Sequence, residues 1–537
     1  MLAPSFLAQP STGTAMVVKG PATLAEALDL GREVRRSVEG LGSSYAPGAL
    51  QRLTGALGGG VVVTTSYSGL GSAEVAVGML AREFRSAQGA APGLCYSACD
   101  CANGPRKVLL AHAEAAEHTG PHHVFSNVMD RVPSGPRQEL EKLVNTELQV
   151  WKAFKRKWGP WSSQARRTKK KMSTRLLQRM IAMLERVEFN NMLPCRVHGQ
   201  LCPANIRLVP GFEEVTWVEI AGSVCKPWSS MGAGDDWLDP TSLPCLVWAY
   251  STKYYEPDII LHECVPSFDY RQLDRILSGR RNACRAPPRN PFGRLSLQEQ
   301  SSWRMRSEIL SPHDFGVPTR RRRRYTYFWR GEHFTIDVGK DAPNGIRDMF
   351  QKERELNASV YLVQRSSETR SVSRRMLEQR KLSCDVPDDA LPCQADCLHP
   401  VWRIHMIGFQ ELAQQKGINL VDPMAAPEVA IVNLVQRPHF SKLIDTDLAP
   451  TLLTGSILFD LVRERRIGLP ECGLMQGLPF ACRELPVELT EHVEHIRFLI
   501  LSGALSDSQV RTLLGNMMHV SVVGSAIAYL LCAVRRL

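Results

Sequence analysis

Two residues of complementary chemistry each follow a short apolar run in the sequence. Cys225 comes soon after the run Thr216–Ile220, and Glu263 comes soon after Ile259–Leu261. Parallel α/β sheets present functional groups beyond the carboxyl ends of their strands, so the thiol and the carboxyl group can meet in one cleft. A nucleophile beside an acid is the minimum needed to attack an electron-poor ring. The chain between them is long enough for a right-handed crossover.

The neighbours of Cys225 favour an accessible thiol. A buried cysteine is most often a small, inert apolar residue. Here Gly222 precedes the cysteine and Pro227 and Gly232 follow it, which predicts a sharply turning loop rather than a packed strand. A second cysteine, Cys393, lies in an irregular stretch without an acidic partner at a suitable distance. We therefore expect Cys225, and not Cys393, to be the nucleophile.

A glycine-containing turn near the start of the chain could hold a second ligand. Glycine lets backbone N–H groups approach a ligand closely, so this turn fits either a nucleotide-like ligand or an ordinary chain reversal. About 30 residues later, Asp100 falls where a Rossmann-like fold binds ribose hydroxyls, although a solvated loop acid is the alternative. The turn consists of Tyr67, Ser68, Gly69, Leu70 and Gly71.

Seven segments of the chain resemble motifs of the C5 cytosine methyltransferases and occur in the order of that family. They fall within roughly residues 60–330 and 448–530. The segments are 65–71 (similar to Asp-Leu-Phe-Ser-Gly-Ile-Gly-Gly), 224–226 (Pro-Cys-Gln), 263–265 (Glu-Asn-Val), 316–323 (Gly-Val-Pro-Gln-x-Arg-x-Arg), 449–451 (Ala-Pro-Thr), 471–479 (Glu-x-x-x-Leu-Gln-Gly-Phe-Pro) and 515–516 (Gly-Asn). The chain departs from the motifs at Thr65, Val224, Lys226, Cys264 and Thr319.

The resemblance implies a function and a set of catalytic residues. It implies methyl transfer from S-adenosyl-L-methionine to C5 of cytosine in DNA, with the base flipped out of the duplex. Cys225 would bond to C6 of the base, and Glu263 would hold N3. Arg321 would face the base, and Arg323 is the second arginine of the motif.

The resemblance also implies cofactor contacts. Besides the glycine-containing turn, Asp100 would bind the ribose and Asn127 would meet the adenine amine. Asn516 would complete the cofactor pocket beside the first strand.

Two other functions stay open. The five departures from the motifs favour a catalytically weak or inactive protein that binds DNA or regulates a partner. A tRNA cytosine-C5 methyltransferase is the third possibility, since RNA is not excluded as a substrate. Cofactor binding separates the first alternative from an enzyme.

Composition bounds the class of protein. The 537 residues are 44% apolar and 22% charged, which is typical of a globular chain with two or three domains. The formal charge of +11 favours a polyanionic partner, though it also serves solubility. Fifteen scattered cysteines predict reduced intracellular thiols. Cys384, Cys393, Cys397 and His399 lack paired Cys-x-x-Cys spacing, so we expect no metal site.

Localisation is expected to be nuclear if the source is eukaryotic and cytoplasmic otherwise. The start of the chain lacks the pattern of a secretory signal. The apolar tract Val520–Val534 is too short to span a bilayer, so we expect a buried helix and no membrane partner. The run Arg320–Arg324 has an alternative interpretation as a basic targeting or phosphate-binding segment. The oligomeric state and target sequence are not indicated.

These features predict a domain organisation. We expect the α/β class, with a doubly wound Rossmann-like class I methyltransferase domain and an inserted smaller target-recognition domain. One amphipathic docking helix is expected near 24–38. The ranges are 1–55 for a partly disordered lead, 56–330 for the catalytic domain with a basic helical insertion at about 134–192, 331–440 for the target-recognition domain, and 441–537 for the C-terminal return.

Overall fold

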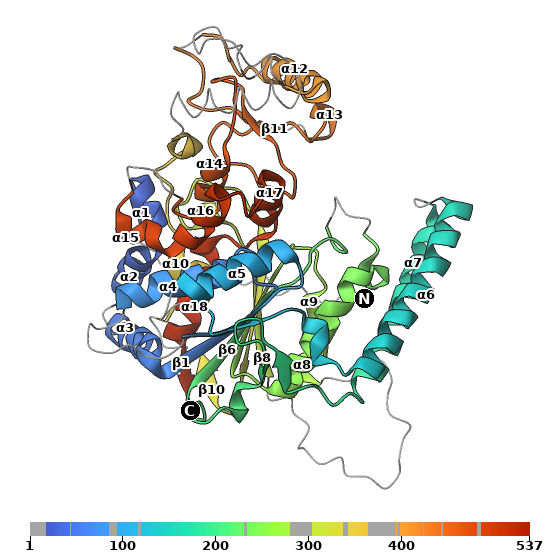
Figure 1. Cartoon of the computed structure of the whole chain (residues 1–537). Helices are drawn as coiled ribbons and strands as arrows, with labels where there is room; N and C mark the ends of the chain where they lie inside the picture. The colour runs from blue at the N-terminus through green and yellow to red at the C-terminus, as the bar shows by residue number, and fades with distance from the viewer. Residues whose placement is uncertain are drawn as a thin grey trace, which may run out of the picture.

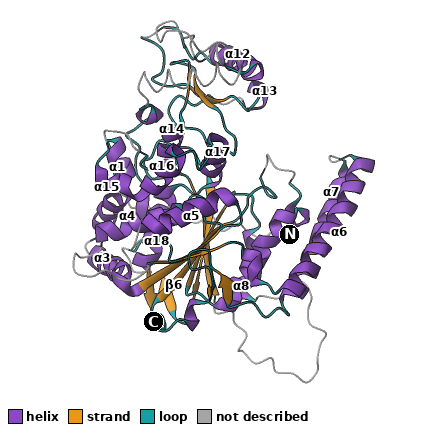
Figure 2. Ribbon diagram, in the orientation of Figure 1, coloured by secondary structure: helices purple, strands orange, loops and turns teal. Residues whose placement is uncertain are grey.

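A seven-stranded sheet lies between two layers of helices (Figures 1 and 2). The computed structural model describes residues 18–42, 44–84, 94–115, 120–159, 162–229, 234–279, 303–336, 342–363, 394, 398–422, 424–441, 444–480 and 485–537. The strands, in spatial order, are β3 (His123–Phe125), β2 (Cys95–Cys99), β1 (Val61–Ser66), β6 (Thr216–Gly222), β7 (Ile259–Cys264), β9 (Arg323–Arg330) and β8 (Trp303–Leu310).

The direction of the strands confirms the predicted doubly wound α/β class. Strands β3, β2, β1, β6 and β7 are parallel to one another. Strand β9 runs antiparallel to both of its neighbours, β7 and β8. A mostly parallel sheet with helices on both faces is the expected result of alternating strands and helices.

Successive residues of the central strands face opposite layers, as the period of two in a strand requires. Val61 and Val63 join one core, while Val62 joins the other. The first core lies under α2 (Leu30–Glu39), α3 (Ala46–Gly55), α4 (Ser72–Phe84) and α18 (Val520–Ala533). The second lies under α6 (Ser134–Trp158), α7 (Ser163–Leu184), α8 (Leu243–Tyr255) and α9 (Tyr270–Ser278).

The N-terminal helix differs from the single helix expected at 24–38. It is two helices, α1 (Leu24–Leu28) and α2, because Asp29 leaves helical geometry and its side chain accepts a bond from Arg32 N at 3.2 Å. Helix α2 packs against α4 and α18 and is therefore part of the main core. The first 17 residues of the expected lead lie outside the described residues.

The expected basic insertion is a helical hairpin. Helices α6 and α7 pack against each other and extend away from the sheet (Figure 1). Glu147 on α6 is 5% exposed and pairs with Arg175 at 2.9 Å and Arg179 at 3.0 Å on α7. After α7 the chain forms the short hairpin β4 (Met192–Pro194) and β5 (Leu201–Pro203).

A small unit with its own core lies beyond the ends of the sheet (Figure 1). It contains α12 (Pro400–Gln415), α13 (Pro438–Ser441) and a sheet of β11 (Ile431–Asn433), β12 (Leu458–Asp460) and β13 (Arg465–Arg466). The chain that leads to this unit contacts the segment between α13 and β12, since Ala358 N donates to Asp447 O at 2.9 Å. The domain boundaries expected at 331 and 440 stay predictions.

The C-terminal part of the chain returns to the main core. The stretch Asp507–Ala533 is long and apolar enough to cross a membrane by length and composition, but it is buried in the protein. This burial matches the helix expected at the C-terminus. The remaining elements are α5 (Asn103–Ala115), β10 (Phe334–Ile336), α10 (Ile346–Phe350), α14 (Leu469–Leu474), α15 (Val487–Thr490), α16 (Glu494–Leu501), α17 (Asp507–Asn516) and β14 (Val534–Arg536).

Candidate functional site

The predicted site residues gather at one edge of the sheet. The cofactor residues follow β1, β2 and β3, whereas Cys225 and Glu263 follow β6 and end β7. The helix after β1, α4, packs in the first core, and the helix after β6, α8, packs in the second. The boundary between β1 and β6 is thus a topological switch point, where ligands of open α/β sheets bind.

The glycine-containing turn has the backbone geometry of a ligand-binding loop. Tyr67 and Gly69 both have φ of 60°, and Gly71 has φ of 78°. Gly71 N donates to Ser68 O at 2.8 Å, which closes the turn immediately before α4. The two positive-φ glycines in this turn admit no ordinary side chain without strain, and they lead directly into the N-terminus of α4. Leu70 is fully buried and anchors the turn.

Asp100 is fixed against this turn. One carboxylate oxygen accepts from Gly69 N at 3.0 Å and the other from Ala102 N at 2.9 Å. Burial raises the pKa of Asp100, and these backbone donors oppose the rise. Each carboxylate oxygen keeps a free lone pair, so the side chain can hold the turn and still accept from a hydroxyl.

Neither of the two asparagines expected at the cofactor lies as a buried, unbonded side chain. Asn127 caps a short helical turn, because its side-chain oxygen accepts from Met129 N at 2.9 Å. The oxygen expected to meet an adenine amine is therefore already engaged once. Asn516 ends α17 and is exposed.

Sequence reasoning missed a buried acid next to the turn. Thr65, where the motif has Asp, donates its hydroxyl proton to Glu74 Oε1 and lies 2.7 Å from Ser68 Oγ. Glu74 is in the first turn of α4 and has no exposed surface. Its Oε2 is buried without a hydrogen-bond partner, and burial raises its pKa. The carboxyl group that the sequence lacks at position 65 is thus supplied beside it by Glu74. An acid opening the helix after a glycine turn is the only signal for it.

Cys225 lies on a tight turn after β6. Trp228 N and Ser229 N both donate to its carbonyl oxygen, at 3.0 and 2.9 Å. The thiol is half-buried. Burial raises its pKa, Arg323 and Arg321 lower it, and Glu263 raises it further. The net effect is a thiol that stays protonated in the resting protein near neutral pH.

Glu263 lies beside the same turn. In the register of β6 and β7 it is paired with Gly222, and a Cβ built on that glycine would lie 3.4 Å from Glu263 Oε2. Its side chain is 7% exposed, and Oε1 lies 3.1 Å from Arg323 Nε. Burial raises the pKa of Glu263, while Arg323 and Arg321 lower it. A carboxyl group with a raised pKa can hold a proton and donate it.

Arg321 makes backbone contacts that the motif does not predict, and its role toward the base stays a prediction. Its Nη1 donates to Leu452 O at 3.0 Å, and its Nη2 donates to Met517 O at 2.6 Å and Gly515 O at 3.2 Å. Both terminal nitrogens thus donate to backbone carbonyls, whereas Nε is buried without a hydrogen-bond partner, and burial lowers the pKa of Arg321 to about 9. Arg323, at the start of β9, is the arginine that contacts Glu263.

The other arginines of this run also have individual partners. Arg320 pairs with Asp445 at 3.0 Å. Arg324 donates to Pro266 O at 3.1 Å and covers the Tyr270 ring at 4.4 Å. Arg322 alone in this run is exposed. The five arginines therefore do not form the solvated basic segment of the alternative interpretation.

The four departures other than Thr65 fall into two groups. Cys264 and Thr319 are buried and have partners: Cys264 Sγ lies 3.7 Å from Ser223 O, and Thr319 Oγ1 donates to Met475 O at 3.1 Å. Val224 and Lys226 are exposed on either side of Cys225. The second pair can therefore touch a ligand.

The competing cysteine, Cys393, lies in a segment outside the described residues. Cys384 and Cys397 also lie outside them. His399 caps α12, since its Nδ1 accepts from Val401 N at 3.4 Å.

Comparison with known proteins finds similar solved structures. No known family profile and no curated protein sequence matches the chain. Similar solved structures include the Entamoeba histolytica methyltransferase EhMeth, with 13% identity, 88% of this chain and 97% of that chain covered, and a TM-score of 0.39. The Dnmt2 methyltransferase of S. pombe is 11% identical over 88% of this chain and 98% of its own, with a TM-score of 0.38. A mutant of Dnmt2 from Spodoptera frugiperda is 13% identical over 87% of this chain and 98% of its own, with a TM-score of 0.35. TM-scores below 0.5 assign no activity to this chain.

Proposed function

We propose that this chain is a C5 cytosine methyltransferase that transfers a methyl group from S-adenosylmethionine to cytosine in DNA. One observation carries the proposal. Cys225, Glu263 and Arg323 converge at the ends of β6 and β7 and the start of β9, and the glycine-containing turn after β1 lies at the neighbouring strand end. A thiol, a carboxyl group and a guanidinium group beside a glycine-containing turn support this function.

The proposed chemistry follows from the electron demand of cytosine. C5 is a weak nucleophile until a thiolate adds to C6, which breaks the C5–C6 double bond and moves electron density to C5. Cys225 loses its proton to solvent water and supplies the thiolate, which is released again when water takes the proton from C5. Glu263 donates a proton toward N3 as charge develops there. Arg323 holds the Glu263 carboxyl group in place and, as a planar donor, suits the carbonyl of the base.

The residues at the first strand end fit the cofactor. S-adenosylmethionine supplies an electrophilic methyl group on a sulfonium centre and also carries a positively charged amino group. The unpartnered, buried Oε2 of Glu74 offers a negative charge beside the turn at 67–71. Asp100 offers a carboxylate to the ribose hydroxyls, held in place by Gly69 and Ala102.

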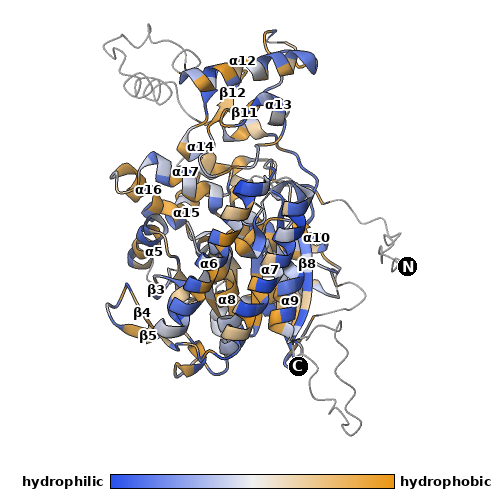
Figure 3. Cartoon of the chain, turned by 90° about the vertical axis from the view of Figure 1, so that its right-hand side faces the viewer, coloured by the Kyte–Doolittle hydropathy of each residue, from blue (hydrophilic) through white to orange (hydrophobic). Residues whose placement is uncertain are grey.

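The basic helical hairpin supports a nucleic acid substrate. Arg166, Arg167, Lys170 and Lys171 on α7 are exposed, and α6 and α7 carry many hydrophilic residues among hydrophobic ones (Figure 3). Lys169 instead pairs with Asp236 at 3.0 Å. Exposed cations on a projecting hairpin can follow a phosphate backbone, and the target base must leave the stack to reach Cys225.

Covalent trapping tests the proposed function. DNA containing 5-fluorocytosine lacks the C5 proton, so the enzyme should remain bonded to it in the presence of S-adenosylmethionine. We expect Cys225→Ser to abolish the adduct and methyl transfer while DNA binding persists, and Cys393→Ser to change neither. An adduct that survives in Cys225→Ser would exclude this assignment.

A regulatory protein without activity is the second candidate, favoured by the exposed departures Val224 and Lys226 beside the thiol. Mass spectrometry of DNA and tRNA after incubation with labelled cofactor separates the cases. Label on cytosine in DNA supports the proposal, label on tRNA changes the substrate, and no label with DNA binding intact favours the regulatory role. Nuclear localisation, proposed for a eukaryotic source, is tested by fluorescence microscopy of the tagged chain.

A further inference from the structure

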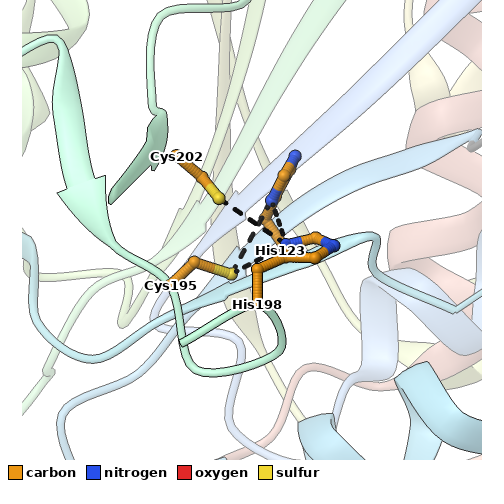
Figure 4. Close-up of side chains that lie close together, drawn as sticks. All are labelled: His123, Cys195, His198 and Cys202. Carbon is orange, nitrogen blue, oxygen red and sulfur yellow. Dashed lines mark hydrogen bonds between the residues drawn. The ribbon is translucent and has the colours of Figure 1, made fainter. Parts of the chain in front are cut away.

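Four side chains that bind metals in proteins converge outside the proposed active site. The ligand atoms of His123, Cys195, His198 and Cys202 all lie within 4.8 Å of one another (Figure 4). His123 comes from β3, at the edge of the main sheet. The other three come from the β4–β5 hairpin that follows α7.

Four of the six distances between the ligand atoms are close to those of a tetrahedral site. Cys195 Sγ lies 3.4 Å from His198 Nδ1 and 3.7 Å from His123 Nδ1, and Cys202 Sγ lies 3.6 Å from His198 Nδ1. The two Nδ1 atoms are 3.1 Å apart. Zinc bonds of about 2.3 Å to sulfur and about 2.0–2.1 Å to nitrogen put tetrahedral S–N edges at about 3.5–3.6 Å and N–N edges at about 3.3–3.4 Å.

The backbone explains how the hairpin presents its three ligands. Cys195 N donates to Gln200 O at 2.8 Å, and Gly199 N donates to Cys195 O at 3.0 Å. Gly199 has φ of 65°, a conformation that glycine adopts without strain. The resulting tight turn places Cys195, His198 and Cys202 around one point.

The hairpin is also joined directly to the edge strand. Arg196 N donates to Val124 O at 2.8 Å, and Phe125 forms an antiparallel bridge with Cys195. These contacts bring His123 to the turn from 72 residues away in the sequence. His198 is exposed, so a metal ion can enter from solvent.

A hydrogen-bonded cluster explains this geometry less well than a cation does. Only one proton can lie between two Nδ1 atoms, and thiols are weak donors. A divalent ion accepts all four lone pairs at once. Two thiolates balance its charge, and the two thiol protons are released to solvent on binding.

We propose that His123, Cys195, His198 and Cys202 form a structural zinc site. Mixed sulfur and imidazole ligands in a tetrahedron are the arrangement that zinc prefers. All four positions are filled by protein, so the ion holds the fold and carries out no chemistry. It fastens the β4–β5 hairpin, and with it the end of α7, to β3. This departs from the sequence-based expectation of no metal site, and it does not depend on the proposed methyltransferase activity.

Metal analysis of the full chain tests the proposal. Protein purified without chelator should contain one zinc ion per chain by plasma mass spectrometry. Cobalt replacing zinc should give the visible bands of tetrahedral coordination and a thiolate charge-transfer band. Loss of an outer partner of a metal ligand costs about 10–100-fold in metal affinity, so His198→Ala and Cys202→Ser should lose at least about 100-fold.

Two matched controls keep the test specific. His122→Ala removes a histidine whose ring lies 4.6 Å from His123 and 5.1 Å from His198 but which is not one of the four ligands. Cys101→Ser removes an exposed thiol elsewhere. Both should keep their zinc. If ligand variants do not fold, zinc-specific chelation of the wild type should lower its melting temperature. Folded wild type with no zinc, cobalt bands unchanged in His198→Ala, or a Cys195–Cys202 disulfide in place of bound metal would each overturn the proposal.

Discussion

At the scale of single residues, neighbouring charges determine when Cys225 can react. Burial and Glu263 raise the pKa of its thiol, and Arg323 and Arg321 lower it. Arg321 donates to three backbone carbonyls. Arg323 is thus the cation that can respond to a bound base.

The first prediction concerns the pH dependence of Cys225. Because its pKa is raised in the folded protein, the thiolate fraction increases only as pH rises through that pKa, and methyl transfer should rise on the alkaline side of neutrality. Arg323→Gln removes a charge that lowers the pKa, so the rise should move to higher pH. Iodoacetamide labelling of Cys225, followed by mass spectrometry, measures this without turnover. Arg322→Gln, at the exposed neighbour, should leave the profile in place. A shift of the Arg323→Gln profile toward acid would contradict the assignment.

The second prediction concerns Glu74. Loss of a charge-assisted contact costs about 1.5–3 kcal/mol, so Glu74→Gln should weaken S-adenosylmethionine binding about tenfold to about a hundredfold. The raised pKa of Glu74 means that its charge appears as pH rises, and wild-type affinity should therefore rise with pH. Titration calorimetry at several pH values measures both effects. Glu83→Gln, at the other end of α4, is the matched control. Equal affinity and pH dependence in Glu74→Gln and wild type would remove Glu74 from the pocket.

At the scale of elements, the α6–α7 hairpin separates structural from available charge. Glu147, Arg175 and Arg179 hold the two helices together, and Lys155 pairs with Asp235 at 2.9 Å. Arg166, Arg167, Lys170 and Lys171 on α7 are exposed and have no ion-pair partner among the described residues. The hairpin thus has a rigid base and a basic outer face.

The third prediction is that this face contributes sequence-independent DNA affinity. Changing Arg166, Arg167, Lys170 and Lys171 to Gln should flatten the plot of log affinity against log salt by up to about 3–4, since each phosphate contact contributes about 0.9. A control changing Arg32, Arg36, Lys107 and Arg497 removes the same charge from α2, α5 and α16 and should change the slope little. Fluorescence anisotropy at several salt concentrations decides. Equal slopes in the two variants would place the DNA elsewhere.

At the scale of the whole molecule, Arg321 joins three distant parts of the chain. It connects the segment before β9 to Leu452, between α13 and β12, and to Gly515 and Met517, at the end of α17. Gly515 lets the backbone of Thr454 lie against the end of α17, because a Cβ on this glycine would lie 2.4 Å from Thr454 N. The contact is therefore one of fold assembly.

The fourth prediction follows from this contact. Arg321→Met leaves buried carbonyls without donors, at a cost of about 1–3 kcal/mol each. We expect a clearly lower melting temperature, measured by circular dichroism, with Arg322→Met unchanged. An Arg321→Met protein of normal stability that has lost methyl transfer would instead support the base-facing role expected from the motif.

The sequence could predict the sheet because its strands are buried on both faces. Runs such as Val61–Val63 and Ile259–Leu261 are apolar throughout, which indicates central parallel strands. The roles of Arg321 and Arg323 could not be separated, since the two lie two residues apart in one motif and differ only in that β9 begins at Arg323. Glu74 was missed because its contact with Thr65 depends on how the turn at 67–71 brings α4 back to the end of β1.

Non-local contacts hid the remaining features. His123 joins its partners across 72 residues, so no spacing rule finds it. The break at Asp29 has a local cause instead. The Asp29 side chain caps α2 and interrupts an otherwise continuous apolar pattern.

The path of the chain through the small unit bears on how this protein could change during evolution. Helix α12 and strand β11 precede Asp447, which accepts a hydrogen bond from Ala358 N, whereas β12 and β13 follow it. Because β12 pairs with both β11 and β13, the two parts of the unit depend on each other. Selection can thus vary the loops of this unit, but it must keep β11 and β12 together, while Cys225 follows β6 and Glu263 lies on β7 in the separate main sheet.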